Sequence, residues 1–318
     1  MKTTRFERAI FLSWYCSLGD CKFCFMSTQK GKIKQPTKAK RSPSSILAEV
    51  LICKKLGWEI EFISVGYGSF DFEELLRYLQ AIKKLWGKKL WLNIGYLNEE
   101  QIKKLKPLVK GVSVSIETVN WKLRKELCPS KPMEPMIQTL RLCDQYGLKK
   151  SITLILGLGE KQTDFQELKK FIAEYKLDQI TFYRLKAQKG TIFVGRKELE
   201  TEDYLYWVRQ TKKEFPKMKI VVGSWMDHLQ EISSLLKAGA DSITKFPSLK
   251  WFGTKYAQQI EEECRKAGRK FQGSLTKLPQ IDWQKEVEQV GLNEKVLVKT
   301  LEYLKLMSKA KNKALLGK

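Results

Sequence analysis

Residues 9–24 read Ala-Ile-Phe-Leu-Ser-Trp-Tyr-Cys-Ser-Leu-Gly-Asp-Cys-Lys-Phe-Cys and combine a structural signal with a chemical one. Residues 9–14 are mostly apolar and aromatic, which predicts a β-strand. Cys16, Cys21 and Cys24 follow directly, in the spacing C-x4-C-x2-C. Folds built from parallel strands place their reactive side chains on the loops after the strands. We therefore expect residues 16–24 to form a functional loop at the carboxyl end of a first strand.

The same strand signal recurs seven more times, and stretches with helical spacing separate the runs. Eight strands, each followed by a helix, predict an α/β fold with a parallel sheet. At 318 residues the expected closure is a (β/α)8 TIM-type barrel, with a doubly wound open sheet as the alternative. The further predicted strands are residues 61–65, 90–94, 112–116, 151–156, 179–183, 219–222 and 241–244.

The pattern changes after about residue 246, where helical stretches near residues 255–267 and 293–308 precede a basic tail. We expect residues 1–246 to form the barrel core and residues 247–318 to form a short helical C-terminal extension packed on it. Expected helix caps are Ser44, Asn98, Thr163 and Thr201.

Composition and charge narrow the class of protein. A hydrophobic content of 43% excludes a disordered chain. No apolar run approaches the ~18 residues that cross a bilayer, and the charged start does not resemble a signal peptide, so we expect a cytoplasmic protein without membrane contact. The net charge of +24 favours anionic partners, either an acidic protein or nucleic acid, and a lysine-rich surface of the thermophile type is the alternative explanation.

Three cysteines within nine residues indicate metal binding rather than disulfides. Three thiolates can hold three corners of a [4Fe–4S] cube and leave the fourth iron open to a cofactor or substrate. Structural zinc wants four ligands, and the chain has one histidine, His228, about two hundred residues away. A non-enzymatic, zinc-stabilised nucleic-acid-binding protein remains the alternative.

The loop with Cys16, Cys21, Cys24 and the aromatic Phe23 resembles the cluster loop of the radical S-adenosylmethionine (SAM) superfamily. The common spacing there is C-x3-C-x2-C, so this chain has one extra residue in the first gap. The resemblance extends over most of the chain and implies a [4Fe–4S] cluster, SAM as the second cofactor and an electron donor protein. It further implies reductive cleavage of SAM to a 5′-deoxyadenosyl radical that abstracts hydrogen from an unactivated carbon.

Three later turns resemble the parts of the superfamily that hold SAM. Residues 65–68, Val-Gly-Tyr-Gly, stand at its glycine-rich turn, with tyrosine in place of the usual acidic residue. Residues 115–117 match its Ser/Glu positions, and residues 153–160 match its G-x-I-x-G-x-x-E element. The positions that the resemblance assigns to SAM are Phe23, Gly66, Tyr67, Gly68, Ser115, Glu117, Ile155 and Gly157.

Residues 117–132, 184–191 and 238–247 are similar to segments of the biotin-synthase-like branch. Biotin synthase itself and the one-chain lipoyl synthases carry further cysteine motifs that are absent here. The resemblance favours a subunit of the two-component lipoyl synthases, a sulfurtransferase that inserts sulfur into an octanoyl chain on an acidic carrier protein. A second radical SAM subunit is then an expected partner. Radical tRNA modification and the rearrangement or methylation of a small molecule are the alternatives within the superfamily.

Three further features carry open hypotheses. Cys128 lies near the loop after the fourth strand and would bind an auxiliary iron–sulfur cluster or handle sulfur, unless it is a buried loop cysteine that acts as a small hydrophobe. The basic residues 29–41 would dock an acidic partner or RNA, or form a solvated loop. His228 is either structural or a substrate contact in the loop after the seventh strand.

Overall fold

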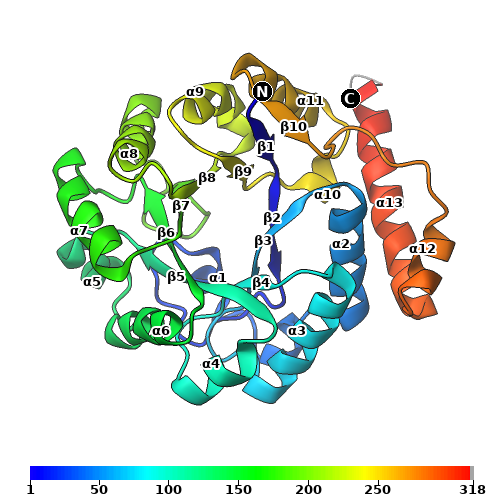
Figure 1. The fold of residues 1–318 in the computed structure, drawn as a ribbon, viewed down its shortest axis with the longest axis horizontal. Coiled ribbons are helices and arrows are strands. Elements are labelled where there is room, and N and C mark those ends of the chain that lie inside the picture. The colour runs from blue at the N-terminus through cyan, green and yellow to red at the C-terminus, as the bar shows by residue number, and fades with distance from the viewer. Residues whose placement is uncertain (316–318) are drawn as a thin grey trace.

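Eight parallel strands form the centre of the molecule, which a computed structural model describes for residues 1–315. Their order in the sheet is their order in the chain, as the predicted barrel requires, and a ring of helices surrounds them (Figure 1). The predicted (β/α)8 barrel is therefore confirmed. The strands are β2 (Glu7–Phe11), β3 (Glu59–Ser64), β4 (Leu90–Asn93), β5 (Val109–Glu117), β6 (Lys149–Leu156), β7 (Gln179–Arg184), β8 (Lys219–Gly223) and β9 (Ser242–Thr244).

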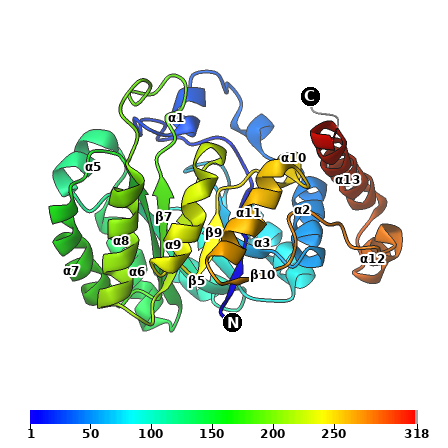
Figure 2. The same ribbon diagram turned by 90° about the horizontal axis from the view of Figure 1, so that it is seen from above.

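The barrel closes weakly between its last and first strands. A single parallel bridge, Phe6 to Ile243, joins β9 to the β2 edge. A second, two-stranded sheet lies at the amino end, where β1 (Thr3–Arg5) pairs in parallel with β10 (Lys270–Gln272). The sequence analysis did not predict either strand. Figure 2 shows the N-terminus at this end and α1 (Phe25–Gln29) at the opposite, carboxyl end.

The helices pack outside the strands. Among the described residues, no helix combines the length and the apolar character that crossing a bilayer would require. The remaining helices are α2 (Pro43–Lys55), α3 (Phe72–Trp86), α4 (Glu99–Leu105), α5 (Trp121–Leu127), α6 (Glu134–Gln145), α7 (Phe165–Tyr175), α8 (Thr201–Glu214), α9 (Ile232–Lys237), α10 (Ser248–Trp251), α11 (Lys255–Lys266), α12 (Trp283–Gln289) and α13 (Glu294–Leu315), with short 3-10 turns at Pro36–Ala39, Gln162–Asp164 and Met226–Glu231.

The last helix, α13, stands outside the ring against α2 (Figure 1). The Tyr303 hydroxyl of α13 is 2.7 Å from the Ser45 hydroxyl of α2 and also accepts a hydrogen bond from Arg41. These polar contacts hold α13 beside α2 and beside Arg41, which lies in the segment between the cysteine loop and α2.

The predicted helix caps are only partly right. Asn98 caps α4 in a full capping box with Gln101. Ser42, not Ser44, caps α2, because Pro43 occupies the first helical position and leaves Ser42 in the extended cap conformation. Thr201 is the first residue of α8 and not its cap, and Thr163 lies inside the 3-10 turn that precedes α7.

The inside and the outside of the barrel differ in chemistry. The contact between strands and helices is apolar, with side chains such as Ile10, Ile63 and Phe182 fully buried. The interior mixes an aromatic cluster of Phe62, Trp91 and Tyr183 with polar groups, and the Glu61 carboxylate accepts hydrogen bonds from the Tyr183 and Thr244 hydroxyls. Buried polar groups of this kind are stable because they satisfy one another.

Candidate functional site

The cysteine loop joins β2 to α1 at the carboxyl end of the barrel, where the sequence placed it. Backbone hydrogen bonds fix it to two neighbouring loops. The Ser17 amide donates to the Tyr67 carbonyl at 2.8 Å, and the Lys22 amide donates to the Leu127 carbonyl at 2.9 Å. The loop is thus held from both sides, by the turn after β3 and by the end of α5.

Cys16, Cys21 and Cys24 are half-buried and none of them forms a disulfide. The amide of Cys24 donates to the carbonyl of Cys21 at 3.0 Å, which turns the loop back on itself. Burial raises the pKa of the Cys24 thiol. A hydrogen bond with the Cys128 thiol, together with burial, raises the pKa of Cys21.

The turn after β3 approaches the cysteine loop closely at Gly66. A Cβ atom there would lie 2.1 Å from the Tyr15 carbonyl oxygen and 2.8 Å from the Cys16 Cβ, so glycine alone fits. Tyr67 beside it is half-buried, and its hydroxyl has no hydrogen-bond partner among the described residues. Burial raises the pKa of Tyr67 to about 12. Gly68 has φ +65° and packs against Ser17.

The end of β5 supplies Ser115 and Glu117. Ser115 exchanges hydrogen bonds with the Asn93 side chain on β4. Glu117 has φ +70°, a rare conformation for a residue with a side chain, and its carboxylate pairs with the Lys131 ammonium at 2.5 Å. Burial opposes the charge of Lys131, but the Glu117 carboxylate raises its pKa above the usual value. The sequence analysis included Lys131 in the segment 117–132 that resembles the biotin-synthase-like branch, but assigned it no role.

The loop after β6 is organised around a carboxylate. The Glu160 side chain accepts hydrogen bonds from the amides of Gly157, Leu158 and Gly159, at 2.6 to 3.1 Å. Gly157 has φ +103°, which favours glycine. Ile155, two residues earlier, packs beside Phe23 of the cysteine loop. The fixed loop therefore presents the predicted positions 155 and 157 next to Phe23.

Cys128 ends α5 and lies beside the cysteine loop. It is 1% exposed and belongs to a small apolar cluster with Phe23 and Leu127, against which Cys21 and Cys24 pack. The structure thus brings a fourth thiol to the predicted trio. Cys53, Cys143 and Cys264 are buried in helices α2, α6 and α11, away from this group.

A cavity of about 480 Å³ opens at this end of the barrel, a size that suits a small-molecule site. Its wall is mainly apolar and aromatic and includes Phe11, Phe23, Ile155 and Leu185. Cys24 lines one side and Lys245, which follows β9, lines another. The sequence analysis did not identify Lys245.

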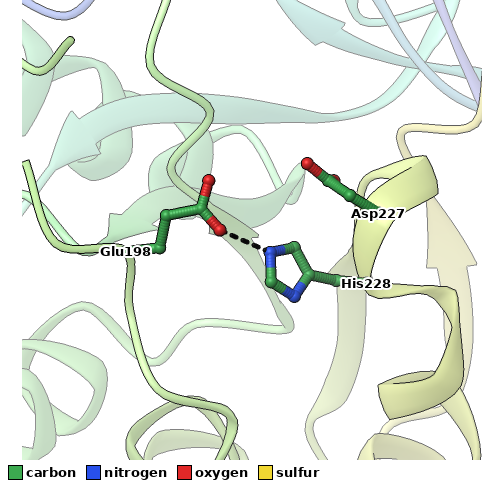
Figure 3. A group of neighbouring side chains, drawn as sticks. All are labelled: Glu198, Asp227 and His228. Atoms are coloured by element: carbon green, nitrogen blue, oxygen red, sulfur yellow. Dashed lines mark hydrogen bonds and ion pairs between the residues drawn. The ribbon is translucent and has the colours of Figure 1, made fainter. Parts of the chain in front are cut away.

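His228 lies in the loop after β8, in a small polar group at the carboxyl end of the barrel (Figure 3). Its Nε2 is 2.7 Å from a Glu198 carboxylate oxygen, and Asp227 points toward the same space. The Asp227 carboxylate also pairs with Lys186. The His228–Glu198 contact and the Asp227–Lys186 ion pair join the loop after β7 to the loop after β8. His228 therefore has a structural role in holding these two loops together.

The basic residues 29–41 leave the cysteine loop through α1 and a 3-10 turn. Their charges are only partly available to a partner. Lys40 pairs with Glu74 and Arg41 pairs with the buried Glu49. The positive patch is therefore smaller than its sequence suggests.

Comparisons with known proteins agree with this geometry. The family model of the radical SAM superfamily matches residues 12–172. The chain is 40% identical over 309 residues to an uncharacterized protein of Methanocaldococcus jannaschii, covering 95% of this chain and 84% of that one. It is 26% identical over 263 residues to a biotin synthase of Nitrosopumilus maritimus, covering 80% and 78%. The crystal structure of methylornithine synthase shares the fold, with a TM-score of 0.66, 15% identity and coverage of 95% and 86%.

Proposed function

This chain belongs to the radical SAM superfamily, and from that membership we propose that Cys16, Cys21 and Cys24 are the ligands of a [4Fe–4S] cluster. The cluster, when bound with SAM, supplies the electron that cleaves the sulfonium and releases a 5′-deoxyadenosyl radical. The protein holds the substrate carbon beside that radical and excludes water and oxygen. The cavity lined by Cys24 is the place where we expect the substrate to bind.

One observation carries the proposal: three half-buried thiols share a loop with an unsatisfied hydroxyl beside it. Four protein ligands would indicate structural zinc, whereas three leave an open corner for a small ligand. We leave Cys128 out of the ligand set because it follows α5, outside the cysteine loop, and is fully buried in the apolar cluster with Phe23 and Leu127. The buried Tyr67 hydroxyl lacks a partner among residues 1–309, and a buried polar group normally has one. A polar cofactor at that corner would provide it. The residues present therefore fit both the cluster and SAM.

We assign the SAM contacts to the surrounding turns. Gly66 and Gly68 let the β3 turn approach the cysteine loop, and Tyr67 would donate to the polar end of SAM. Ser115 and Glu117 lie at the end of β5, and Lys131, from the segment after α5, pairs with Glu117 there, so both charges would be near the amino acid group of SAM. Ile155 and Gly157 would pack against the adenine. These assignments follow the motif positions and the rigid loops that hold them.

For the substrate we propose an octanoyl chain on an acidic carrier protein, into which the enzyme inserts sulfur as a lipoyl synthase subunit. The apolar cavity wall suits a hydrocarbon chain, and the +24 charge suits an acidic partner. We place Cys128 beside Cys21 in sulfur handling, because no other cysteine lies near the trio. Inorganic sulfide or a persulfide would be the sulfur source.

Replacing one ligand tests the cluster assignment. Cys21→Ala, purified and reconstituted without oxygen, is expected to lose the brown colour and the formation of 5′-deoxyadenosine from SAM with dithionite. Cys264→Ala, which removes a buried helix thiol elsewhere, is the matched control and should keep both. Retained SAM cleavage in Cys21→Ala would reject the assignment.

The substrate proposal needs its own assay. The reconstituted enzyme is incubated with an octanoylated carrier domain, SAM, reductant, sulfide and the candidate partner subunit. Mass spectrometry of the carrier should show replacement of hydrogen by sulfur. If the carrier mass stays constant while SAM is cleaved, the radical SAM assignment stands and the lipoyl synthase assignment falls.

A further inference from the structure

Five cationic side chains line the cavity, and their charges are balanced unequally. Four of them have carboxylate partners within the protein. Lys245 has no ion-pair or hydrogen-bond partner for its ammonium among residues 1–309. The four paired cations are Arg8 and Arg41, which share Glu49, Arg184 with Glu231, and Lys186 with Asp227.

The backbone and the packing both direct Lys245 into the cavity. Its φ is +70°, a conformation that costs energy for any residue with a side chain and that concentrates at functional sites. Its Nζ lies 4.1 Å from the centre of the Tyr183 ring. Gly223 makes the space, because a Cβ there would lie 2.6 Å from the Lys245 Cγ and 2.7 Å from Tyr183.

The nearest acidic group does not serve as its partner. The two carboxylate oxygens of Glu61 accept hydrogen bonds from Tyr183 and Thr244. No Glu61 oxygen is within the 4.0 Å that defines an ion pair with Lys245. Burial lowers the pKa of Lys245, as expected for an ammonium whose charge is incompletely balanced. Lys245 is half-buried, and its ammonium has three donors that face a mostly apolar cavity wall, which favours a ligand with an acceptor oxygen.

We propose that the cavity binds an acyl chain, whose carboxyl-level oxygen accepts a hydrogen bond from the Lys245 ammonium. The chain itself would lie along the apolar wall toward Phe23 and Cys24, where the superfamily's radical is expected. That oxygen is either the carboxylate of a free acid or the amide carbonyl of a carrier-bound chain. The inference rests on the proposed function only for the position of the radical.

The cavity favours this ligand over more highly charged ones. A phosphate would need several unpaired cations, and each of the other four already has a carboxylate partner, although Arg8 and Arg41 share Glu49. An alkyl amine would place a second positive charge next to Lys245. One acceptor oxygen attached to a hydrocarbon matches one available cation in an apolar wall.

Direct binding tests the inference without turnover. Anaerobically reconstituted protein is titrated with octanoate, an N-octanoyl-lysine peptide and octylamine, using calorimetry. Wild-type protein should bind octanoate or the octanoyl peptide and should bind octylamine much more weakly. Lys245→Met should weaken acyl binding about 10- to 100-fold, which is the usual worth of a hydrogen bond to a charged group.

The control is Lys250→Met, which removes an exposed lysine on α10 outside the cavity and should bind acyl ligands as the wild type does. If octanoate alone binds tightly, the ligand is a free acid. If the octanoyl peptide alone binds tightly, the ligand is a carrier-bound chain. Equal acyl affinities of wild type and Lys245→Met, tight octylamine binding, or no acyl binding would each overturn the inference. If Lys245→Met lacks the circular dichroism signal of the folded protein, Lys245→Gln is used in its place in the titration.

SAM cleavage, measured on the same wild-type preparation, separates the two proposals. Cleavage without Lys245-dependent acyl binding contradicts this inference and leaves the radical SAM assignment intact. Lys245-dependent acyl binding without SAM cleavage supports this inference and contradicts the radical SAM assignment.

Discussion

The two ends of the barrel each contain a hollow, and the hollows differ in their walls and in the surroundings of their unpaired cations. The amino-end hollow has about 590 Å³ and a mixed polar and apolar lining from the starts of the strands. Its Arg5 and Lys88 both pair with Glu59 and its Lys219 pairs with Glu7, while its Lys110 has no ion-pair or hydrogen-bond partner among residues 1–309 but is exposed to water. The carboxyl-end cavity has a mostly apolar wall, three thiols nearby and one half-buried ammonium, that of Lys245, without such a partner.

This difference separates a structural hollow from a functional one. Paired charges neutralise one another and exposed ones are solvated by water, so the charges of the amino end need no ligand. At the carboxyl end the Tyr67 hydroxyl is buried without a hydrogen-bond partner, and the half-buried Lys245 ammonium faces a mostly apolar wall. The size of the two hollows does not distinguish them, whereas the thiols and the half-buried unpaired ammonium of the carboxyl end do.

The largest expected effect comes from breaking a satisfied pair within the carboxyl end. Arg184→Met leaves the buried Glu231 carboxylate without its guanidinium and should lower the free energy of unfolding by about 3–5 kcal/mol. Lys245→Met removes an unbalanced charge and should not lower it. Urea denaturation at pH 7 measures both. A loss below about 1 kcal/mol for Arg184→Met would show that the pair is not desolvated as the structure indicates.

The second prediction concerns Glu61 inside the barrel. Burial raises the pKa of Glu61 from 4.5 to about 7. A raised carboxyl pKa stabilises the fold at low pH, and the contribution is lost as the pH rises through about 7. Relative to Glu61→Gln, the wild type should therefore lose roughly 3 kcal/mol of unfolding free energy between pH 4.5 and 7.5. A difference that stays constant across this range would refute the shift.

The third prediction concerns the close approach at the cysteine loop. Gly66→Ala places a methyl group against the Tyr15 carbonyl and Cys16, so the loop must move. We expect a loss of SAM cleavage of about 100-fold, the usual cost of a misplacement near 1 Å. Gly31→Ala is the control, because nothing lies within 4 Å of its added Cβ. Similar rates in both variants would mean that the turn after β3 does not position the loop.

The smallest effect is expected at the amino end. Lys219→Met removes a partner of Glu7, but the lysine is 38% exposed and Glu7 keeps its hydrogen bond from Ser242. Unfolding free energy should fall by about 1–2 kcal/mol, because the buried Glu7 carboxylate then keeps only the Ser242 hydrogen bond, and SAM cleavage should not change. A several-fold loss of cleavage would show that the amino end takes part in the reaction and would remove the distinction drawn here.

The sequence was sufficient for the eight barrel strands because they recur between helical stretches, and even the three-residue β9 falls into that alternation. It was not sufficient for β1 and β10, which have three residues each and stand outside the alternation. Ser42 and Ser44 could not be ranked as caps without considering Pro43. Such errors arise where two local signals compete or where the signal is too short.

The candidate site shows a similar division. Cys16, Cys21 and Cys24 are neighbours in the chain, so their spacing was readable directly. Lys131 and Lys245 were assigned no role because their significance depends on groups elsewhere: Glu117 beside the first, and the lack of any partner for the second. Whether a charge is balanced is a property of the folded chain and leaves no trace in the order of residues.

Counting iron, acid-labile sulfide and zinc in protein purified without oxygen tests the central claim most directly. The account predicts about four irons and four sulfides for each chain, and an electron paramagnetic resonance signal of the reduced protein that changes when SAM is added. One zinc ion for each chain, held by four protein ligands and indifferent to SAM, would contradict it.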